Sequence, residues 1–260
     1  MGELLAIMRR LRAPEGCAWD RQQSFASIVP YTIEEAYEVA DAVERGNMSD
    51  LKDELGDLLF QVVFHAQLAN EAGSFDFAAV AHTISEKLVR RHPHVFAEAG
   101  QQSLQALKAS WEDIKATERS GRAESGHLAG VPRALPALLR AYKLSARAAR
   151  AGFDFEHADQ CADKVAEELA EVREAAARVE PSQNAERAQL EEEIGDLLFA
   201  AANLARKLEV DAETALRAAN DKFERRFRAM ESLARERGEA FANLDLAAQE
   251  RLWQAVKRSE

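Results

Sequence analysis

The chain has 260 residues, and its 45 acidic residues outnumber the 34 lysines and arginines to give a formal net charge of −11. This acidity argues against non-specific nucleic-acid binding, which needs a basic surface. No apolar run approaches the roughly 20 residues of a membrane-spanning helix, and no secretory signal is visible, so we expect neither a membrane nor a nucleic-acid partner. The two cysteines are far apart and form no metal-binding motif, which favours a reducing, cytoplasmic location.

Strong helix formers fill the stretches between only 12 glycines and 6 prolines, and no run alternates as a strand would, so the predicted fold class is all-α. We expect helices at residues 3–12, 31–45, 49–71, 76–91 and 103–119, and then at 134–150, 158–178, 186–207, 211–236 and 245–258. Thr32 with Glu35 has the spacing of a capping box at a helix start. Gly46 and Gly73 have the position of helix stops.

The chain contains an internal repeat. The segment Asp53-Glu-Leu-Gly-Asp-Leu-Leu-Phe60 recurs as Glu192-Glu-Ile-Gly-Asp-Leu-Leu-Phe199. Three further matches keep the same order: 33–39 with 166–172, Lys87/Arg91 with Lys222/Arg226, and Trp111/Lys115 with Trp253/Lys257. We therefore predict two copies of one helical unit, at 1–119 and 134–260, joined by a glycine-rich linker at 120–133.

Acidic residues recur at helical spacing in both copies. Residues three or four apart share a helix face, so the pattern predicts paired carboxylates on two neighbouring helices of each copy. The candidates are Glu34, Glu35, Glu38, Glu54 and Asp57 in the first copy, and Glu167, Glu168, Glu171, Glu193 and Asp196 in the second. Such a cluster repels itself and keeps some members protonated unless a cation such as Mg²⁺ or Mn²⁺ neutralises it.

A solvated acidic face is the alternative interpretation, and it would be the preferred one for a single isolated motif. The motif occurs twice, however, and each time beside a glycine inside a predicted helix, Gly56 or Gly195. Because glycine destabilises a helix interior, its presence suggests a close approach of backbone or ligand. A di-iron or di-manganese bundle is disfavoured, because the one Glu-x-x-His, from Glu124 to His127, lies in the linker.

The repeated cations and tryptophans allow two interpretations each. Lys87 with Arg91, and Lys222 with Arg226, are either ordinary surface charges or a clamp for phosphate oxygens. Trp111 and Trp253 are either core residues or stacking platforms for a base, with Lys115 and Lys257 one turn away.

These motifs as a set resemble the MazG family of nucleoside triphosphate pyrophosphohydrolases, in the all-α NTP pyrophosphatase superfamily, and nearly the whole chain resembles its tandem two-domain bacterial form. The segments 17–20 (Cys-Ala-Trp-Asp) and 90–96 (Arg-Arg-His-Pro-His-Val-Phe) add to the resemblance. One departure is Ala18, where the family pattern leads us to expect proline. The resemblance implies a four-helix-bundle-like unit and Mg²⁺-dependent hydrolysis of broad-specificity NTP and dNTP substrates to nucleoside monophosphate and pyrophosphate.

The resemblance also implies roles for the second copy's residues. Glu168, Glu171, Glu193 and Asp196 would hold the metal, and Glu167 and Glu192 would orient or deprotonate the attacking water. The candidates for nucleotide and phosphate contacts are Lys164, Asn220, Lys222, Arg226, Trp253 and Lys257.

The first copy is a second candidate site, with the residues Glu34, Glu35, Glu38, Asp53, Glu54, Asp57, Lys87, Arg91, Trp111 and Lys115. It has Ser85 for Asn220 and Asp53 for Glu192, and the family's two-domain members rely on the C-terminal domain, so we favour the second copy as the catalytic one. The alternatives are a narrow dUTP- or dCTP-type pyrophosphatase and a non-catalytic nucleotide-binding helical regulator. The family resemblance also leads us to expect a homodimer.

Overall fold

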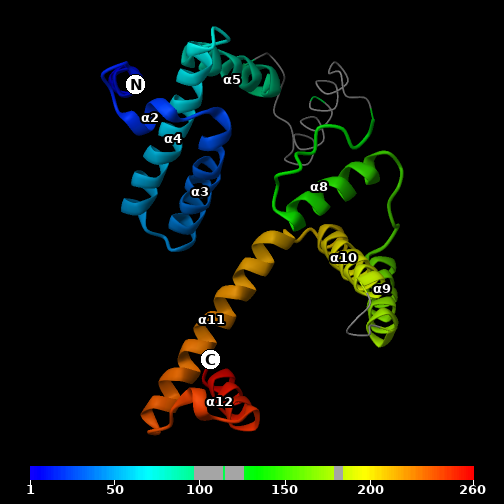
Figure 1. Ribbon diagram of the computed structural model, residues 1–260. Coiled ribbons are helices and arrows are strands. Elements are labelled where there is room, and N and C mark those ends of the chain that lie inside the picture. The colour runs from blue at the N-terminus through cyan, green and yellow to red at the C-terminus, as the bar shows by residue number, and fades with distance from the viewer. Residues whose placement is uncertain (97–113, 115–125, 179–183) are drawn as a thin grey trace. The chain divides into compact units, whose positions relative to one another are not determined.

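The computed structural model describes residues 1–96, 114, 126–178 and 184–260 (Figure 1). It divides into two compact units, Met1–Lys115 and Ala116–Glu260. Every element within these described ranges is helical, as the composition predicts. Trp111, Lys115 and all but Ile114 of the helix expected at 103–119 lie outside the described residues.

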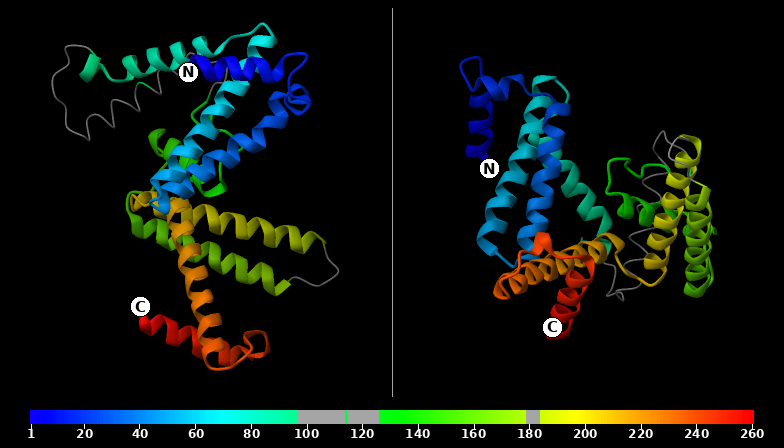
Figure 2. Two further views of the ribbon diagram at one scale, coloured as in Figure 1. Left: turned by 90° about the vertical axis from the view of Figure 1, so that its left-hand side faces the viewer. Right: turned by 60° about the horizontal axis from the view of Figure 1, so that its bottom comes forward.

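The first unit is built on an antiparallel pair of long helices, α3 (Phe25–Glu44) and α4 (Met48–Glu71), which lie side by side in both figures (Figures 1 and 2). Around this pair the described residues of the unit form further helices: α1 (Gly2–Arg12), α2 (Ala18–Gln22), α5 (Phe77–Arg91) and α6 (Pro93–Phe96). Helix α1 packs against α4, and α5 begins where the turn after α4 ends.

The second unit repeats this plan with α9 (Ala158–Arg178) and α10 (Asn184–Lys207) as the long pair (Figure 2). Its other elements are α8 (Ala137–Arg150), α11 (Ala212–Glu236), the short 3₁₀ turn η1 (Phe241–Asn243) and α12 (Leu246–Ser259). Helix α8 packs against α10, as α1 packs against α4.

The start of α3 differs from the prediction. The helix begins at Phe25, six residues before the expected position, and Ser24 caps it in a reciprocal pair with Ser27. The capping box predicted at Thr32 is wrong, because Thr32 lies inside the helix and its hydroxyl donates to the carbonyl of Ile28 at 3.2 Å. Pro30 does not end α3, although a proline beyond the first turn removes a backbone hydrogen bond.

The other predicted helix ends that fall on described residues agree with the structure within three residues, the largest shift being at α8, which starts at Ala137 after Pro136. Both predicted glycine stops are confirmed. Gly46 and Gly73 follow α3 and α4 with φ angles of 65° and 67°, the left-handed conformation that glycine adopts without steric cost.

The two units bury different cores. In the first unit, Met8 from α1 and Ile28 from α3 surround Phe64 and its neighbours on α4. In the second unit, a cluster of large buried residues joins α11 to α12 around Met230 and Leu252. Between α9 and α10 several of the buried residues are small, including Ala175 and Ala202. None of the described helices combines the length and apolarity needed to cross a bilayer.

Candidate metal centres

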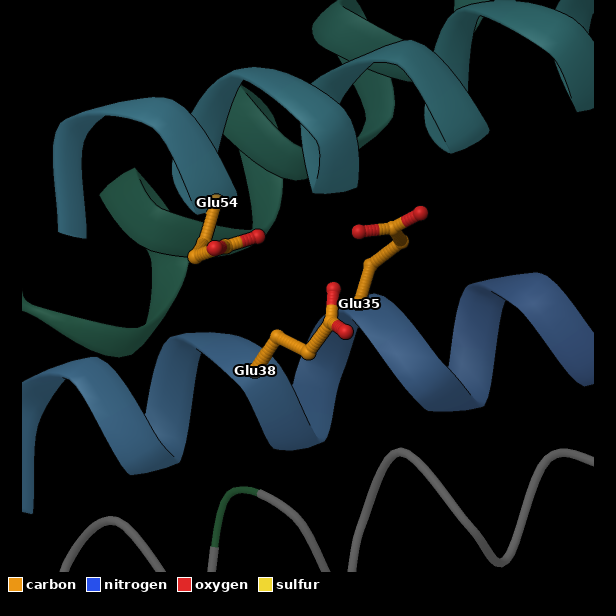
Figure 3. Close-up of side chains that lie close together, drawn as sticks. All are labelled: Glu35, Glu38 and Glu54. Atoms are coloured by element: carbon orange, nitrogen blue, oxygen red, sulfur yellow. The ribbon is translucent and has the colours of Figure 1, made fainter. Parts of the chain in front are cut away.

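The first acidic cluster lies between α3 and α4. Glu35 and Glu38 project from α3, Glu54 projects from α4, and one carboxylate oxygen of each lies within 4.8 Å of the others (Figure 3). Glu35 and Glu38 share a face because they are three residues apart. The predicted meeting of carboxylates from two neighbouring helices is therefore present in the structure.

The electrostatics of this cluster are those of an uncompensated acidic site. Partial burial and the neighbouring carboxylates Asp57 and Glu38 raise the pKa of Glu35. The pKa of Glu54 is also raised, by desolvation and then by Glu38 and Asp57. The cluster thus favours retained protons or a bound cation, as the sequence argument expects.

Further candidates of the first copy are among the described residues and lie outside this three-residue cluster. Glu34 is exposed on α3 and lies outside it, and the exposed Asp53 faces Lys52 at 3.6 Å. Lys87 and Arg91 lie one turn apart on α5, both partly buried. The phosphate-clamp role predicted for this pair stays a prediction.

The second acidic cluster lies between α9 and α10. It joins Glu168 to Glu193 and Asp196, again with one carboxylate oxygen of each within 4.8 Å of the others. Glu168 is only 6% exposed. Glu171 lies one turn along α9, and its hydrogen bond with Glu168 raises its own pKa.

The second cluster carries a lysine that the first lacks. The ammonium of Lys164 lies 2.8 Å from a carboxylate oxygen of Glu167 and 2.8 Å from one of Glu168. This contact lowers the pKa of Glu168 and raises that of Lys164. The repeat register places Tyr31 at the equivalent position of the first copy, where its ring packs edge-on against Trp19 at 5.9 Å. Lys164, predicted as a phosphate contact, is thus held by carboxylates.

Arg226 and Trp253 come together on α11 and α12. The Arg226 guanidinium lies 5.5 Å from the centre of the Trp253 ring and 2.6 Å from a carboxylate oxygen of Glu260. Lys222 and Lys257 are exposed on the same two helices, and Asn220 is exposed on α11. In the described part of the chain, no ion pair or hydrogen bond joins these five residues to the acidic cluster of α9 and α10. Their grouping with that cluster in one site stays a prediction.

Gly56, Gly195 and Glu192 were also singled out in the sequence. A Cβ atom added at Gly56 or Gly195 would meet nothing within 4 Å, so a close approach of the chain's own backbone is wrong as the reason for these glycines. Glu192, proposed to act on water, is exposed on α10 and lies outside the three-residue cluster, next to Glu193.

Sequence reasoning overlooked an apolar pocket of about 470 Å³ beside the second cluster, between α8 and α10. Its aromatic lining residues Phe153 and Phe155 belong to a short loop before α9. A signal in the sequence is the aromatic residue followed by an aspartate that precedes the first long helix in both copies, Trp19-Asp20 and Phe153-Asp154.

Comparison with known proteins identifies the family. A family model described as the MazG nucleotide pyrophosphohydrolase domain matches residues 23–96 and again residues 155–230. The chain belongs to this family. Each match spans one of the two acidic clusters, and the tandem arrangement inferred from the repeat is confirmed.

Relatives of the MazG family extend over nearly the whole chain. The nucleoside triphosphate pyrophosphohydrolase of Escherichia coli (strain K12) is 52% identical over 258 residues, which are 99% of this chain and 97% of the relative. The nucleoside triphosphate pyrophosphohydrolase/pyrophosphatase MazG of Thermotoga maritima is 43% identical over 98% of this chain and 94% of its own length. A solved structure, the mazG-related protein from Thermotoga maritima, is 27% identical, with a TM-score of 0.39 over 45% of this chain and 99% of that one.

Proposed function

We propose that the chain hydrolyses nucleoside and deoxynucleoside triphosphates with broad base specificity, releasing nucleoside monophosphate and pyrophosphate, and so keeps the nucleotide pool free of unwanted members. Family membership and the 52% identity to a pyrophosphohydrolase over nearly the full length support the reaction. The observation that carries the proposal within the structure is the meeting of carboxylates from facing helices in both copies.

The donor set fits Mg²⁺. Each cluster offers only carboxylate oxygens, which are the ligands a hard divalent cation prefers. Glu168, Glu193 and Asp196 would hold the ion in the second copy, with Glu171 one turn away. When bound, the ion would supply charge neutralisation of the triphosphate and a lowered pKa for a bound water.

The chain's own residues would position the substrate around that ion. Lys164 already lies between two carboxylates, and its ammonium is available to phosphate oxygens once a metal takes over Glu168. Glu192 is exposed beside Glu193, where its carboxylate can accept a proton from water. Arg226 and Lys222 would clamp phosphate, and Trp253 would face the nucleotide.

We assign catalysis to the second copy. A site that takes a metal-bound triphosphate needs both carboxylates for the ion and a cation for the phosphates, and Lys164 supplies that cation within the cluster. The first copy has Tyr31 at this place. The acidic cluster of the first copy would therefore bind a cation but would lack this lysine for contacts with the phosphates of the substrate.

We further propose that the enzyme is a cytoplasmic homodimer. Leu55, Leu59 and Val62 lie along one stripe of α4 and are each at least 36% exposed, and Ile194 and Leu198 repeat the pattern on α10. A second copy of the chain would cover these apolar stripes. Both cysteines are free thiols, in keeping with a reducing compartment.

The test is a product assay on the full chain with a panel of NTPs and dNTPs. We expect pyrophosphate and nucleoside monophosphate from several bases, with the reaction abolished by EDTA and restored by Mg²⁺. Orthophosphate as the first product would contradict the cleavage position, activity on dUTP or dCTP alone would favour the narrow enzyme, and binding without turnover would favour the regulator.

A further inference from the structure

The buried positions of α9 repeat every seven residues. They are Cys161, Glu168 and Ala175, which are 1%, 6% and 3% exposed and form one row on the helix that packs against α10. None of the three is a large apolar side chain, and the larger apolar residues beside the row, such as Val165 and Leu197, are only partly buried. Interlocking large side chains normally stop one helix from sliding along another, so this row by itself holds the register of α9 against α10 weakly.

A series of polar contacts joins the two helices at one end of this row. The Asn203 amide nitrogen donates a hydrogen bond to the Cys161 sulfur at 3.9 Å, and the Asn203 oxygen accepts one from Arg206 at 2.9 Å. Arg206 is also bonded to Asp154, whose carboxylate lies 3.1 Å from the ammonium of Lys207. The contacts thus run from α9 to α10 and back to the loop that leads into α9.

The contact between Cys161 and Asn203 lies equally far from the acidic cluster on both helices. Glu168 follows Cys161 by seven residues on α9, and Asp196 precedes Asn203 by seven residues on α10. Seven residues correspond to about 10 Å along a helix. Because α9 and α10 are antiparallel (Figure 2), this contact sets Glu168 opposite Asp196, and these two residues meet in the cluster.

The first unit holds the same register with apolar side chains. The repeat places Ile28 at the position of Cys161 and Phe64 at the position of Asn203. Ile28 and Phe64 are fully buried and belong to one core cluster. The two copies therefore align their carboxylates with different contacts at the same place, a packed apolar pair in the first and a hydrogen-bonded polar pair in the second.

The second acidic cluster tolerates little sliding of α9 along α10. Its three carboxylates offer oxygens within 4.8 Å of one another, and Mg²⁺ requires ligand oxygens at about 2.1 Å. A slip by one residue would move α9 by about 1.5 Å and turn its buried face by about 100°, which would carry Glu168 away from α10. A slip would also leave the buried amide and thiol without their partners, and this penalty is how a polar residue between two helices specifies their register.

We propose that Asn203, held in place by Arg206 and Asp154, is a positioning residue that fixes the register of α9 against α10 and so shapes the cation site of the second copy. It acts through the two helices, about two turns from the carboxylates, without touching the ion. The inference rests on the proposed function, because it takes the cluster of α9 and α10 as the Mg²⁺ site.

The experiment measures Mg²⁺ binding to the full chain by calorimetry. Every variant carries Glu54→Gln, which removes a carboxylate of the first cluster so that the second dominates the signal, and the chain with this change alone is the reference. We expect Asn203→Ala to weaken Mg²⁺ binding about 10-fold, at a temperature where circular dichroism shows a folded protein. Asn184→Ala, the same change at the exposed start of α10, is the control and should leave the affinity unchanged.

The contact of the first copy should restore the site. Cys161→Ile combined with Asn203→Phe introduces the apolar pair of the first unit, and the pocket of about 470 Å³ lined by Asn203 has room for the ring. We expect the Mg²⁺ affinity of this double variant to lie within about 3-fold of the reference. Such a rescue requires that the contact acts by aligning the helices, since neither new side chain is a metal ligand.

Asp154→Asn is a second variant, which leaves the side chains between α9 and α10 unchanged. It removes the anion that holds Arg206, so we expect Mg²⁺ binding to weaken about 3-fold. Glu156→Gln, at an exposed position of the same loop, is its control. Leu252→Ala opens a cavity in the core of α11 and α12, and it should lower the Tm without changing the Mg²⁺ affinity.

The outcomes separate the register role from the proposed function. Reference affinity in both Asn203→Ala and Asp154→Asn would overturn the register role, while pyrophosphate release by the wild type would still uphold the function. Equal weakening in Leu252→Ala would also overturn it, because lost stability would then be a sufficient cause. A wild type that neither binds Mg²⁺ nor releases pyrophosphate would refute the function itself.

Discussion

The ammonium of Lys164 lies 2.8 Å from the carboxylate of Glu168, a side chain that is only 6% exposed. This pair makes the two acidic clusters electrostatically different, although each joins three carboxylates from two facing helices. The second cluster is partly neutralised before any metal arrives, and the first is not.

Equivalent substitutions in the two clusters should have unequal effects. Glu193→Gln and Glu54→Gln keep the side-chain shape and remove one carboxylate from each cluster. We expect the first to lower kcat for pyrophosphate release about 100-fold, as for loss of a metal ligand or its support, and the second to change it less than about 3-fold. Equal losses in the two variants would contradict the assignment of catalysis to the second copy.

Removing Lys164 should make the protein depend on metal for stability. In EDTA, Lys164→Met leaves the buried Glu168 carboxylate without its cation, so we expect a lower Tm. Added Mg²⁺ should raise the Tm of this variant more than that of the wild type, because the ion takes over the neutralisation. Lys52→Met, which breaks an exposed ion pair with Asp53, is the control and should change little.

Removing a charge from the first cluster should change the Tm in the opposite direction. The pKa of Glu35 is raised in the folded protein, so its contribution to stability is present below its usual value of 4.5 and is lost as the pH rises through the folded pKa. In EDTA we expect Glu35→Gln to raise the Tm at pH 7 and to change it little near pH 4.5. With Mg²⁺ at pH 7 the variant should be the less stable protein.

Glu34→Gln is the matched control for this measurement, because Glu34 is exposed on the same helix and lies outside the cluster. A Glu35→Gln variant with a lower Tm than the wild type in EDTA at pH 7 would show that the cluster is not repulsive.

Glu260 should compete with phosphate for Arg226. The two side chains are 2.6 Å apart, and the contact with Arg226 lowers the pKa of Glu260 to about 2, so the pair persists at any pH used for an assay. If Arg226 clamps the triphosphate, Glu260→Gln should lower KM about 3-fold with little change in kcat. Glu250→Gln on α12 is the control, and an unchanged KM in Glu260→Gln would remove Arg226 from the phosphate site.

Arg12 should stabilise the packing of α1 against the rest of the first unit. Its guanidinium bonds to Glu71 at 2.5 Å and to the backbone carbonyls of Asp20 and Gln23, and it covers the ring of Phe64. We expect Arg12→Ala to lower the free energy of unfolding by about 2 kcal/mol, measured by urea denaturation. The exposed Arg9→Ala should cost less than about 0.5 kcal/mol, and a loss that small for Arg12→Ala would contradict its role as the link.

The internal repeat already contained the information needed to place the start of α3. Helix α9 begins at Ala158, as predicted, and the offset of 133 residues between copies places the start of α3 at Phe25, where it is observed. The prediction instead placed that start at residue 31, because Thr32 and Glu35 have the spacing of a capping box. Local cap chemistry was misleading where the comparison of copies was correct.

The amino-acid sequence was sufficient for the features that repeat at short range. Helical content follows from composition, and the two copies follow from the recurring segments. The carboxylate pairs on each helix follow from spacings of three and four residues, because such neighbours share a helix face whatever the rest of the chain does. The pocket, the buried ring of Phe64 and the placement of Arg226 against Glu260 were decided only by the fold. They depend on which distant segments pack together, and that is set by the burial of side chains from separate helices.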